Sequence, residues 1–260
     1  MLKYAIFAAM KKIPVILASL LALMGCAGQG EGYDVFLMIG QSNMAGRGTL
    51  LESDFDETFE GVFLLDSLDT PVPATHPFNQ YSTIRKSLSM QQMNPACAFS
   101  KEIHSKTGRK VLLVVNAKGG TGLDSWMPGT LYFNEAVRRT REAEKHGTLK
   151  AILWHQGCTD GDKGKVDDYA DRLCAMVTAL RDSLGAPRIP FVAGEVARWN
   201  SYAGPLNAQI HSAVERLEPS ACVSSEGCGM LRDESDPHFS REGQLLLGGR
   251  YAGKVLELVY

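Results

Sequence analysis

The feature that most constrains the fold is a regular alternation of short apolar runs with amphipathic stretches of helical length, from about residue 110 onward. The runs are apolar at consecutive positions rather than at every second one. Strands apolar on both faces must be covered on both faces, which is typical of a parallel sheet with helical crossovers. We expect strands at 110–115, 151–154, 189–196 and 221–223, and helices at 131–146, 166–184, 206–217 and 241–258.

The preceding part of the chain fits the same α/β class. Apolar runs at 35–39 and 62–65 predict two further strands, and 95–106 suits a helix with proline in its first turn. The stretch 66–94 is rich in polar residues and proline and has no period, which is typical of a functional rim or lid. No repeat or second boundary interrupts 33–260, so we expect one domain over that range.

The amino-terminal residues have the composition of a secretory signal. Lys11 and Lys12 precede an apolar run, 13–24, that is too short to span a bilayer as a mature helix. We therefore expect a signal peptide over 1–25 and an exported protein. A formal net charge of −2 argues against a nucleic-acid-binding protein, which usually carries a basic face.

The end of this segment predicts a membrane anchor. Leu23-Met24-Gly25-Cys26 resembles the lipobox of bacterial lipoproteins, in which the cysteine is lipidated after cleavage. We expect a lipid on Cys26, a small polar tether over 26–32, and a place on the outer membrane or periplasmic face of the cell envelope. The alternative is a plain secretory signal cut a few residues later.

A candidate nucleophile stands where the first expected strand ends. The strand stops at Gly40, and Ser42 follows in the segment Ile39-Gly40-Gln41-Ser42-Asn43-Met44. A turn from strand to helix can hold a hydroxyl at the carboxyl edge of a sheet, where α/β proteins bind ligands. The serine could equally be the N-cap of the helix.

Polar and glycine-rich segments follow the other strands, and their coincidence is the argument for an active site. They include Lys118-Gly119-Gly120-Thr121, His155-Gln156-Gly157-Cys158 and Asp236-Pro237-His238. Acyl transfer needs a nucleophile, a base, a group that orients the base, and N–H donors for the oxyanion. We assign Ser42 as nucleophile and His238 as base, and we expect the oxyanion to be bound by the backbone N–H groups of Ser42 and Gly120 and the amide of Gln156.

These motifs, in this order, resemble those of the sialate O-acetylesterase-like branch of the SGNH (GDSL-type) hydrolases, which includes carbohydrate esterase family six. The resemblance implies a three-layer α/β/α, flavodoxin-like fold that removes acetyl groups from the hydroxyls of an oligo- or polysaccharide, without a metal or cofactor. The matching motifs and the loop before Trp126 supply the candidate substrate-binding residues, which are Gln41, Asn43, Gly119, Trp126 and His155.

The chain departs from the family pattern at two positions. The family acid usually stands three residues before the histidine, where this chain has Ser235, so either Asp236 or Asp233 orients His238, and Asp236 is favoured. Cys158 stands where relatives usually carry glutamate. Both departures leave open a degenerate esterase that binds glycans at the cell surface, and acyl transfer between sugars is a third hypothesis.

We interpret the other histidines and the cysteine spacing without assigning them a role in catalysis. A histidine that ends a buried strand, as His155 does, is more often a hydrogen-bonded core residue than a base. The remaining histidines show no metal-ligand grouping in the sequence and are interpreted as surface or core residues. No C-x-x-C pair is present, so we expect no structural zinc site.

Overall fold

The computed structural model describes residues 32–260, and Tyr33–Tyr260 form one compact unit. The predicted signal peptide, Cys26 and all but the last residue of the predicted tether lie outside the described residues. None of the helices within 32–260 has the length and apolar character that crossing a bilayer requires.

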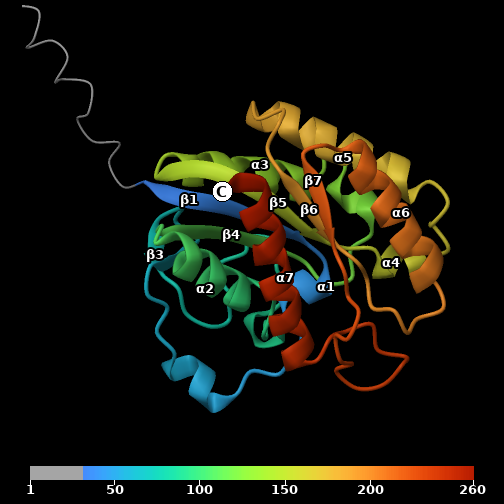
Figure 1. The fold of residues 1–260 in the computed structure, drawn as a ribbon, viewed down its shortest axis with the longest axis horizontal. Helices are drawn as coiled ribbons and strands as arrows, with labels where there is room; N and C mark the ends of the chain where they lie inside the picture. Colours follow the sequence, from blue (N-terminus) through green and yellow to red (C-terminus); the bar gives the residue numbers. More distant parts are fainter. Residues whose placement is uncertain (1–31) are drawn as a thin grey trace, which may run out of the picture. The chain divides into compact units, whose positions relative to one another are not determined.

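Seven strands within 32–260 form a single sheet in the order β3-β2-β4-β1-β5-β6-β7 (Figure 1). Six of them are mutually parallel, as predicted, and β3 pairs antiparallel with β2. The strands are β1 Tyr33–Gly40, β2 Val62–Leu65, β3 Pro71–Pro73, β4 Val111–Ala117, β5 Gly147–His155, β6 Phe191–Gly194 and β7 Ser220–Val223.

β3 lies inside the stretch 66–94, where the sequence shows no period and predicts a rim or lid. Pro71 and Pro73 lack the backbone N–H that a central strand needs, so their strand is restricted to an edge of the sheet. Three residues with two prolines carry no readable alternation, which is why the sequence did not predict this strand.

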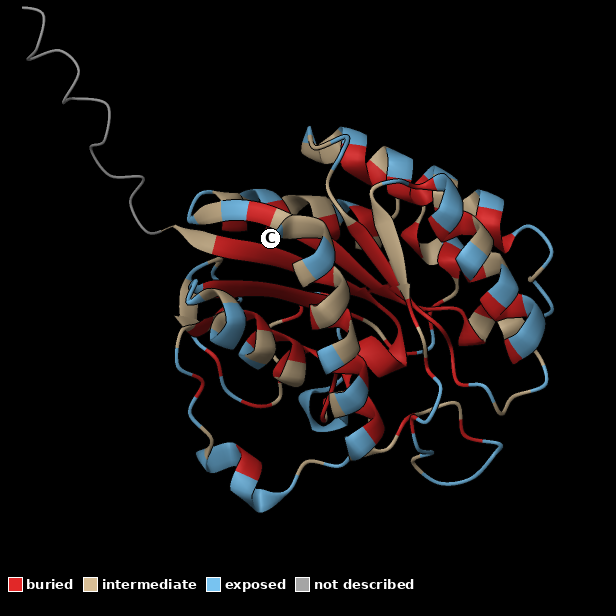
Figure 2. Ribbon diagram, in the orientation of Figure 1, coloured by how far each residue is buried: buried red, intermediate tan, exposed pale blue. Residues whose placement is uncertain are grey.

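Helices cover both faces of the sheet. α2 and α7 pack together on one face, as the ribbon shows, and α3, α5 and α6 cover the other (Figure 1). Successive residues of β1 point to opposite sides, so Leu37 joins one core and Met38 the other, and the central strands are buried throughout (Figure 2). The predicted three-layer α/β/α fold is confirmed. The helices are α2 Ala96–Thr107, α3 Leu131–Glu144, α5 Tyr169–Leu184, α6 Ala203–Arg216 and α7 Arg241–Val259.

Short helical turns occupy the loops and were not predicted individually. Each is too short to show a hydrophobic period in the sequence. The α-helical turns are α1 Ser42–Ala45 and α4 Cys158–Asp162, and the 3₁₀ turns are η1 Glu52–Asp56, η2 Leu88–Met90 and η3 Leu123–Trp126. α1 follows β1 and α4 follows β5, so both lie at the carboxyl ends of neighbouring strands.

Candidate active site

The loops after three adjacent strands meet at one edge of the sheet. β4, β1 and β5 are neighbours, and they are followed by Gly119 and Gly120, by Ser42, and by Cys158 respectively. The loop 230–239, here called the histidine loop, completes a pocket of about 490 Å³. The pocket is lined by Gln41, Ser42, Arg47, Lys86, Met90, Gly119, Gly120, Cys158, Thr159, Asp162, Leu231, Arg232, Pro237 and His238.

The turn that carries Ser42 depends on a glycine. Gly40 has φ of +138°, and a Cβ there would lie 2.2 Å from the carbonyl oxygen of His155 in the neighbouring strand. Only glycine allows the backbone to pass this close. Gln41, not Ser42, is the N-cap residue of α1, and no side chain caps the helix. The hydroxyl of Ser42 is therefore available for another partner.

That partner is His238. Ser42 Oγ lies 2.9 Å from His238 Nε2, although the two residues are far apart in the sequence. On the other side of the ring, Nδ1 lies 2.5 Å from Asp236 Oδ1, although the angle at Nδ1 falls short of hydrogen-bond geometry. The same oxygen accepts the backbone N–H of His238 at 3.1 Å. The structure thus brings together the nucleophile, base and favoured acid predicted from the sequence.

Asp233, the alternative acid, is directed elsewhere. One of its carboxylate oxygens accepts hydrogen bonds from the backbone N–H of Ser235 at 2.9 Å and from the Ser235 hydroxyl at 2.5 Å. Asp236, by contrast, is buried, and Arg232 Nε donates to its second oxygen at 2.5 Å. Trp199 Nε1 donates to the carbonyl oxygen of Asp236 at 2.8 Å, which fixes the backbone.

The pKa values of His238 and Asp236 are both lowered, which suits a base and the carboxylate that orients it. Burial lowers the pKa of His238, and the charge of Asp236 opposes this without reversing it. Burial acts to raise the pKa of Asp236, but hydrogen bonding from Arg232 and the charge of His238 outweigh it and hold the pKa below its usual range. At neutral pH the imidazole is therefore neutral and the carboxylate ionised.

Two of the three predicted oxyanion donors are placed at the pocket. The backbone N–H groups of Ser42 and Gly120 have no hydrogen-bond acceptor within residues 32–260, and both residues line the pocket. Gly120 has φ of +78°, a conformation that favours glycine. Gly119 also lines the pocket, and a Cβ there would lie 2.5 Å from Arg47 Nη2 and 3.3 Å from Ser42 Cβ.

The prediction that the amide of Gln156 is the third oxyanion donor is wrong, because its N–H groups are used inside the protein. The side chain is fully buried, and its Nε2 donates to the Thr121 carbonyl oxygen at 2.9 Å and to Asp160 Oδ2 at 2.6 Å. The Tyr169 hydroxyl donates to its Oε1 at 2.9 Å. Both amide atoms are therefore occupied beneath the pocket, and Gln156 holds the loops after β4 and β5 together instead of facing a ligand.

Gln41 and Asn43 were predicted to bind substrate, and each makes hydrogen bonds within the protein. Gln41 lines the pocket, but its Oε1 accepts the backbone N–H groups of Gly157 at 3.2 Å and Thr159 at 3.3 Å. Asn43 is fully buried and does not line the pocket. Its Nδ2 donates to the Pro237 carbonyl oxygen at 3.0 Å, and its Oδ1 accepts the Phe239 N–H at 3.3 Å. Asn43 therefore clamps the histidine loop on both sides of His238.

Trp126 and His155 were also candidate substrate-binding residues, and both are core residues. Trp126 is buried, packs edge-to-face on Trp154 at 5.5 Å, and donates from Nε1 to Thr121 Oγ1 at 3.1 Å. His155 is fully buried beneath α7, and burial lowers its pKa to about 4. Its Nδ1 lies 3.2 Å from the Tyr251 hydroxyl. His155 is therefore a hydrogen-bonded core residue. Neither Trp126 nor His155 lines the pocket.

Three cationic side chains of the pocket were not predicted from the sequence. Arg47, Lys86 and Arg232 all line it, and Asp162 is the one carboxylate among its lining residues. The Arg47 guanidinium donates to the carbonyl oxygens of Gly46 at 2.8 Å and Met90 at 2.5 Å rather than to a carboxylate. These residues come from separate loops with no common spacing, so no sequence pattern points to them.

Cys158 is buried at the pocket wall, and burial raises the pKa of its thiol to about 12. A thiol with such a pKa is a poor nucleophile at neutral pH. The nearby carboxylate of Asp160 faces away from the serine, because it accepts the Leu123 N–H at 2.9 Å and pairs with Arg172 at 3.2 Å. Within residues 32–260, the carboxylate in contact with His238 is that of Asp236.

Two sequence comparisons relate this chain to carbohydrate esterases. The family model described as carbohydrate esterase, sialic acid-specific acetylesterase matches residues 32–257. A protein of Arabidopsis thaliana named as a probable carbohydrate esterase is 27% identical over 236 residues, which cover 82% of this chain and 86% of the relative.

Solved structures show the same fold. An X-ray structure of an Arabidopsis thaliana protein has a TM-score of 0.76 at 24% identity and covers 88% of this chain and all of that one (100%). A structure described as a novel carbohydrate acetylesterase from Xanthomonas citri has a TM-score of 0.63 at 18% identity, over 87% of this chain and 57% of that chain.

Proposed function

Because this chain belongs to the carbohydrate esterase, sialic acid-specific acetylesterase family, we propose that it removes acetyl groups from sugar hydroxyls through a covalent acetyl-serine intermediate on Ser42. Membership of the family makes the chain a carbohydrate esterase. The serine mechanism, the substrate and the cellular location are the parts that we propose here.

The proposed reaction has two halves. Ser42 Oγ attacks the acetyl carbonyl carbon while His238 Nε2 takes the hydroxyl proton, and the N–H groups of Ser42 and Gly120 bind the oxyanion. Collapse of the tetrahedral intermediate breaks the bond to the sugar oxygen, which receives the proton from His238. Water then attacks the acetyl-serine with His238 again as base, and acetate leaves with the serine restored.

One observation carries this proposal, the 2.9 Å contact between Ser42 Oγ and His238 Nε2 at the floor of an open pocket. Hydrogen-bond contact between a nucleophile and a base that is itself held by a third group is the geometric signature of nucleophilic catalysis. Asp236 is that third group.

Acetate release tests the proposal. The purified protein is incubated with a small aryl acetate and with acetylated glycans, beside Ser42→Ala and His238→Ala and two exposed controls, Ser201→Ala and His146→Ala. We expect both site variants to lose at least about 10³-fold in kcat and both controls to retain it. Acetate release by Ser42→Ala at the wild-type rate would contradict the mechanism. Glycan binding without acetate release by the folded wild type would favour the degenerate-esterase hypothesis.

We further propose that the acetylated sugar carries a negative charge near the ester. Arg47 and Lys86 line the pocket and pair with no carboxylate within residues 32–260, so they are available to an anionic substrate. The description of the matched family, which names sialic acid, supports the same chemistry. We expect kcat/KM for an acetylated sugar acid to exceed that for its methyl ester at low salt, and Arg47→Gln to reduce this preference. Equal values for acid and ester in the wild type would contradict it.

We also propose that the protein is exported and anchored by lipid at Cys26. Lys11 and Lys12, the apolar run 13–24 and the lipobox-like Leu23-Met24-Gly25-Cys26 support this. In a bacterial host, the full-length chain should incorporate labelled fatty acid and fractionate with membranes, and Cys26→Ala should do neither. Incorporation that persists in Cys26→Ala would contradict lipidation at this residue.

A further inference from the structure

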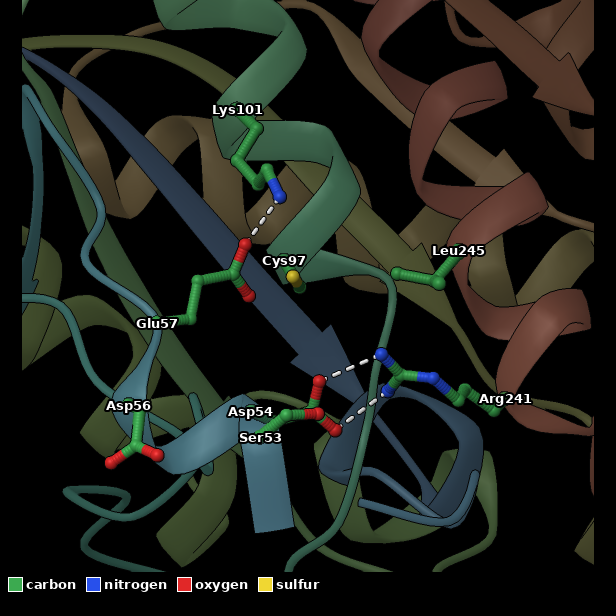
Figure 3. A pocket seen from close by; sticks show the side chains of 8 residues that line it. All are labelled: Ser53, Asp54, Asp56, Glu57, Cys97, Lys101, Arg241 and Leu245. Carbon is green, nitrogen blue, oxygen red and sulfur yellow. Dashed lines mark hydrogen bonds and ion pairs between the residues drawn. The ribbon is translucent and has the colours of Figure 1, made fainter. Parts of the chain in front are cut away.

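Three potential metal ligands that are remote from one another in sequence meet on the side of the molecule near η1. Glu57 follows η1, His76 lies in the loop after β3, and Cys97 is in the first turn of α2. Their ligand atoms lie within 4.8 Å of one another. Glu57 and Cys97 also line a pocket of about 420 Å³ that shares no lining residue with the pocket of Ser42 (Figure 3).

The imidazole of His76 is the unusual member of this group. Its side chain is 1% exposed, yet neither ring nitrogen has a hydrogen-bond partner within residues 32–260. Phe59 and Phe78 pack edge-on against the ring at 5.3 and 5.1 Å and hold it in place. Buried polar atoms are almost always hydrogen-bonded, so an unpartnered buried imidazole requires an explanation. Its Nε2 lies 3.6 Å from Glu57 Oε2, directed into the cluster.

We propose that Glu57, His76 and Cys97 bind a zinc ion, with water from the adjoining pocket as the fourth ligand. Imidazole nitrogen, thiolate sulfur and carboxylate oxygen are the donors that zinc uses in proteins, with bonds of roughly 2.0–2.3 Å. Ligand atoms around a tetrahedral zinc are then roughly 3.3–3.8 Å apart. The three ligand atoms lie within 4.8 Å of one another, so their separations exceed this range by at most about 1 Å.

The two cations beside the cluster, Lys101 and Arg241, are each already paired with a carboxylate. Lys101 Nζ contacts Glu57 Oε1 at 2.5 Å, which leaves Oε2 for the metal and fixes the orientation of the carboxylate (Figure 3). Asp54, on the same wall, is already paired through both oxygens with Arg241 at 2.7 and 2.8 Å (Figure 3). Zinc, one thiolate and one carboxylate sum to zero charge. Binding displaces the thiol proton of Cys97 to solvent, so no other reactant is needed.

The position of the site indicates a stabilising role. The ion would join η1, α2 and the stretch 66–94, which otherwise includes only the short β3 and η2 as regular structure. Asp54 of η1 is paired with Arg241, the first residue of α7, which lies three residues after His238. An ion that fixes η1 would therefore also support the start of α7. The site lies outside the pocket of Ser42 and takes no part in ester hydrolysis.

Cobalt substitution tests the proposal directly, because thiolate-bound Co²⁺ has a charge-transfer band in the near ultraviolet. The full chain is stripped with a chelator and titrated with Co²⁺, beside Cys97→Ser and a matched variant of another buried cysteine, Cys228→Ser. We expect one equivalent of Co²⁺ to produce the band in the wild type and in Cys228→Ser, and no band in Cys97→Ser. No band in folded wild type, or an undiminished band in Cys97→Ser, would overturn the proposal.

A second variant covers the case in which Cys97→Ser folds poorly. His76→Gln retains a polar side chain of similar size but removes the imidazole ligand. We expect it to bind zinc at least about 10-fold more weakly than the wild type by calorimetry. We also expect added zinc to raise the thermal midpoint of the wild type but not that of His76→Gln. Equal zinc affinity in the two proteins would reject His76 as a ligand.

Discussion

Asp236 shows how a carboxylate only two residues before a histidine can reach its ring. Oδ1 of Asp236 contacts both the backbone N–H and Nδ1 of His238, on the other side of Pro237. The usual spacing of three residues is therefore not required, because Arg232 holds the carboxylate of Asp236 and Trp199 holds its backbone carbonyl. Asp236 was favoured from the sequence because it is close to His238 along the chain. The contacts of Arg232 and Trp199 with Asp236 could not be predicted from the sequence.

We predict that Asp236→Asn lowers kcat by about 10³–10⁴-fold, as loss of the orienting carboxylate does in serine triads. The ring of His238 would lose the partner that fixes its tautomer. Asp233→Asn is the matched control, because that carboxylate bonds only Ser235 among the residues of its turn. Steady-state hydrolysis of an aryl acetate measures both. A larger loss in Asp233→Asn than in Asp236→Asn would assign the role to Asp233 instead.

The lowered pKa of His238 predicts the pH profile. The base must be neutral to take the serine proton, and its pKa lies below the usual value of about 6.5. The profile of kcat/KM should thus be level at neutral pH and fall as pH drops through the lowered pKa, with its midpoint under about 6.5. A midpoint above about 7 would mean that the charge of Asp236 outweighs burial.

At the scale of elements, the site is built by the crossing of chain segments at the end of β1. Asn43 joins α1 to the histidine loop, Gln41 joins β1 to α4, and Gln156 joins the loops after β4 and β5. The sequence identified these segments correctly because strand ends meet at one edge. It predicted substrate binding for Asn43 and an oxyanion donor in Gln156, both of which are buried outside the pocket lining. A sequence does not show whether a polar side chain in a loop points into the pocket or beneath it.

We predict that Asn43→Ala lowers both the stability of the protein and its kcat. The Phe239 N–H and the Pro237 carbonyl oxygen would each lose a hydrogen bond, which costs about 1–3 kcal/mol in the free energy of unfolding when such groups are buried. We also expect kcat to fall by more than about 10-fold, with KM little changed, because His238 is displaced while the pocket wall remains. Chemical denaturation and initial rates measure the two effects. Unchanged kcat in the folded variant would show that Asn43 does not position the histidine.

At the scale of the whole molecule, the catalytic edge stands on a sheet covered by two separate layers of helices. The alternation of apolar runs and helices predicted this architecture, because a strand buried on both faces has few other solutions. The edge strand β3 and the proposed zinc cluster escaped prediction for one reason. Both depend on contacts between residues with no periodic relation in the chain, such as Glu57, His76 and Cys97.

Substitution of Tyr251 tests whether the packing of α7 on the sheet can be weakened without a loss of activity. Its buried hydroxyl donates to the Trp154 carbonyl oxygen at 2.7 Å and so attaches α7 to β5, away from the pocket lining. We predict that Tyr251→Phe lowers the free energy of unfolding by about 1–3 kcal/mol and leaves kcat/KM within about twofold. Denaturant titration and rate assays at a temperature where both proteins are folded decide this. A large loss of kcat/KM there would place Tyr251, or its neighbour His155, in the reaction.

The central claim is that Ser42 becomes acetylated, and mass spectrometry of acid-quenched enzyme measures this most directly. During turnover of an activated acetyl ester, the wild type should gain the mass of one acetyl group, located by peptide mapping on the segment that contains Ser42. Ser42→Ala should gain none. Acetylation of another residue, or steady turnover without any acetylated enzyme in the wild type or in variants slowed in deacylation, would contradict the account.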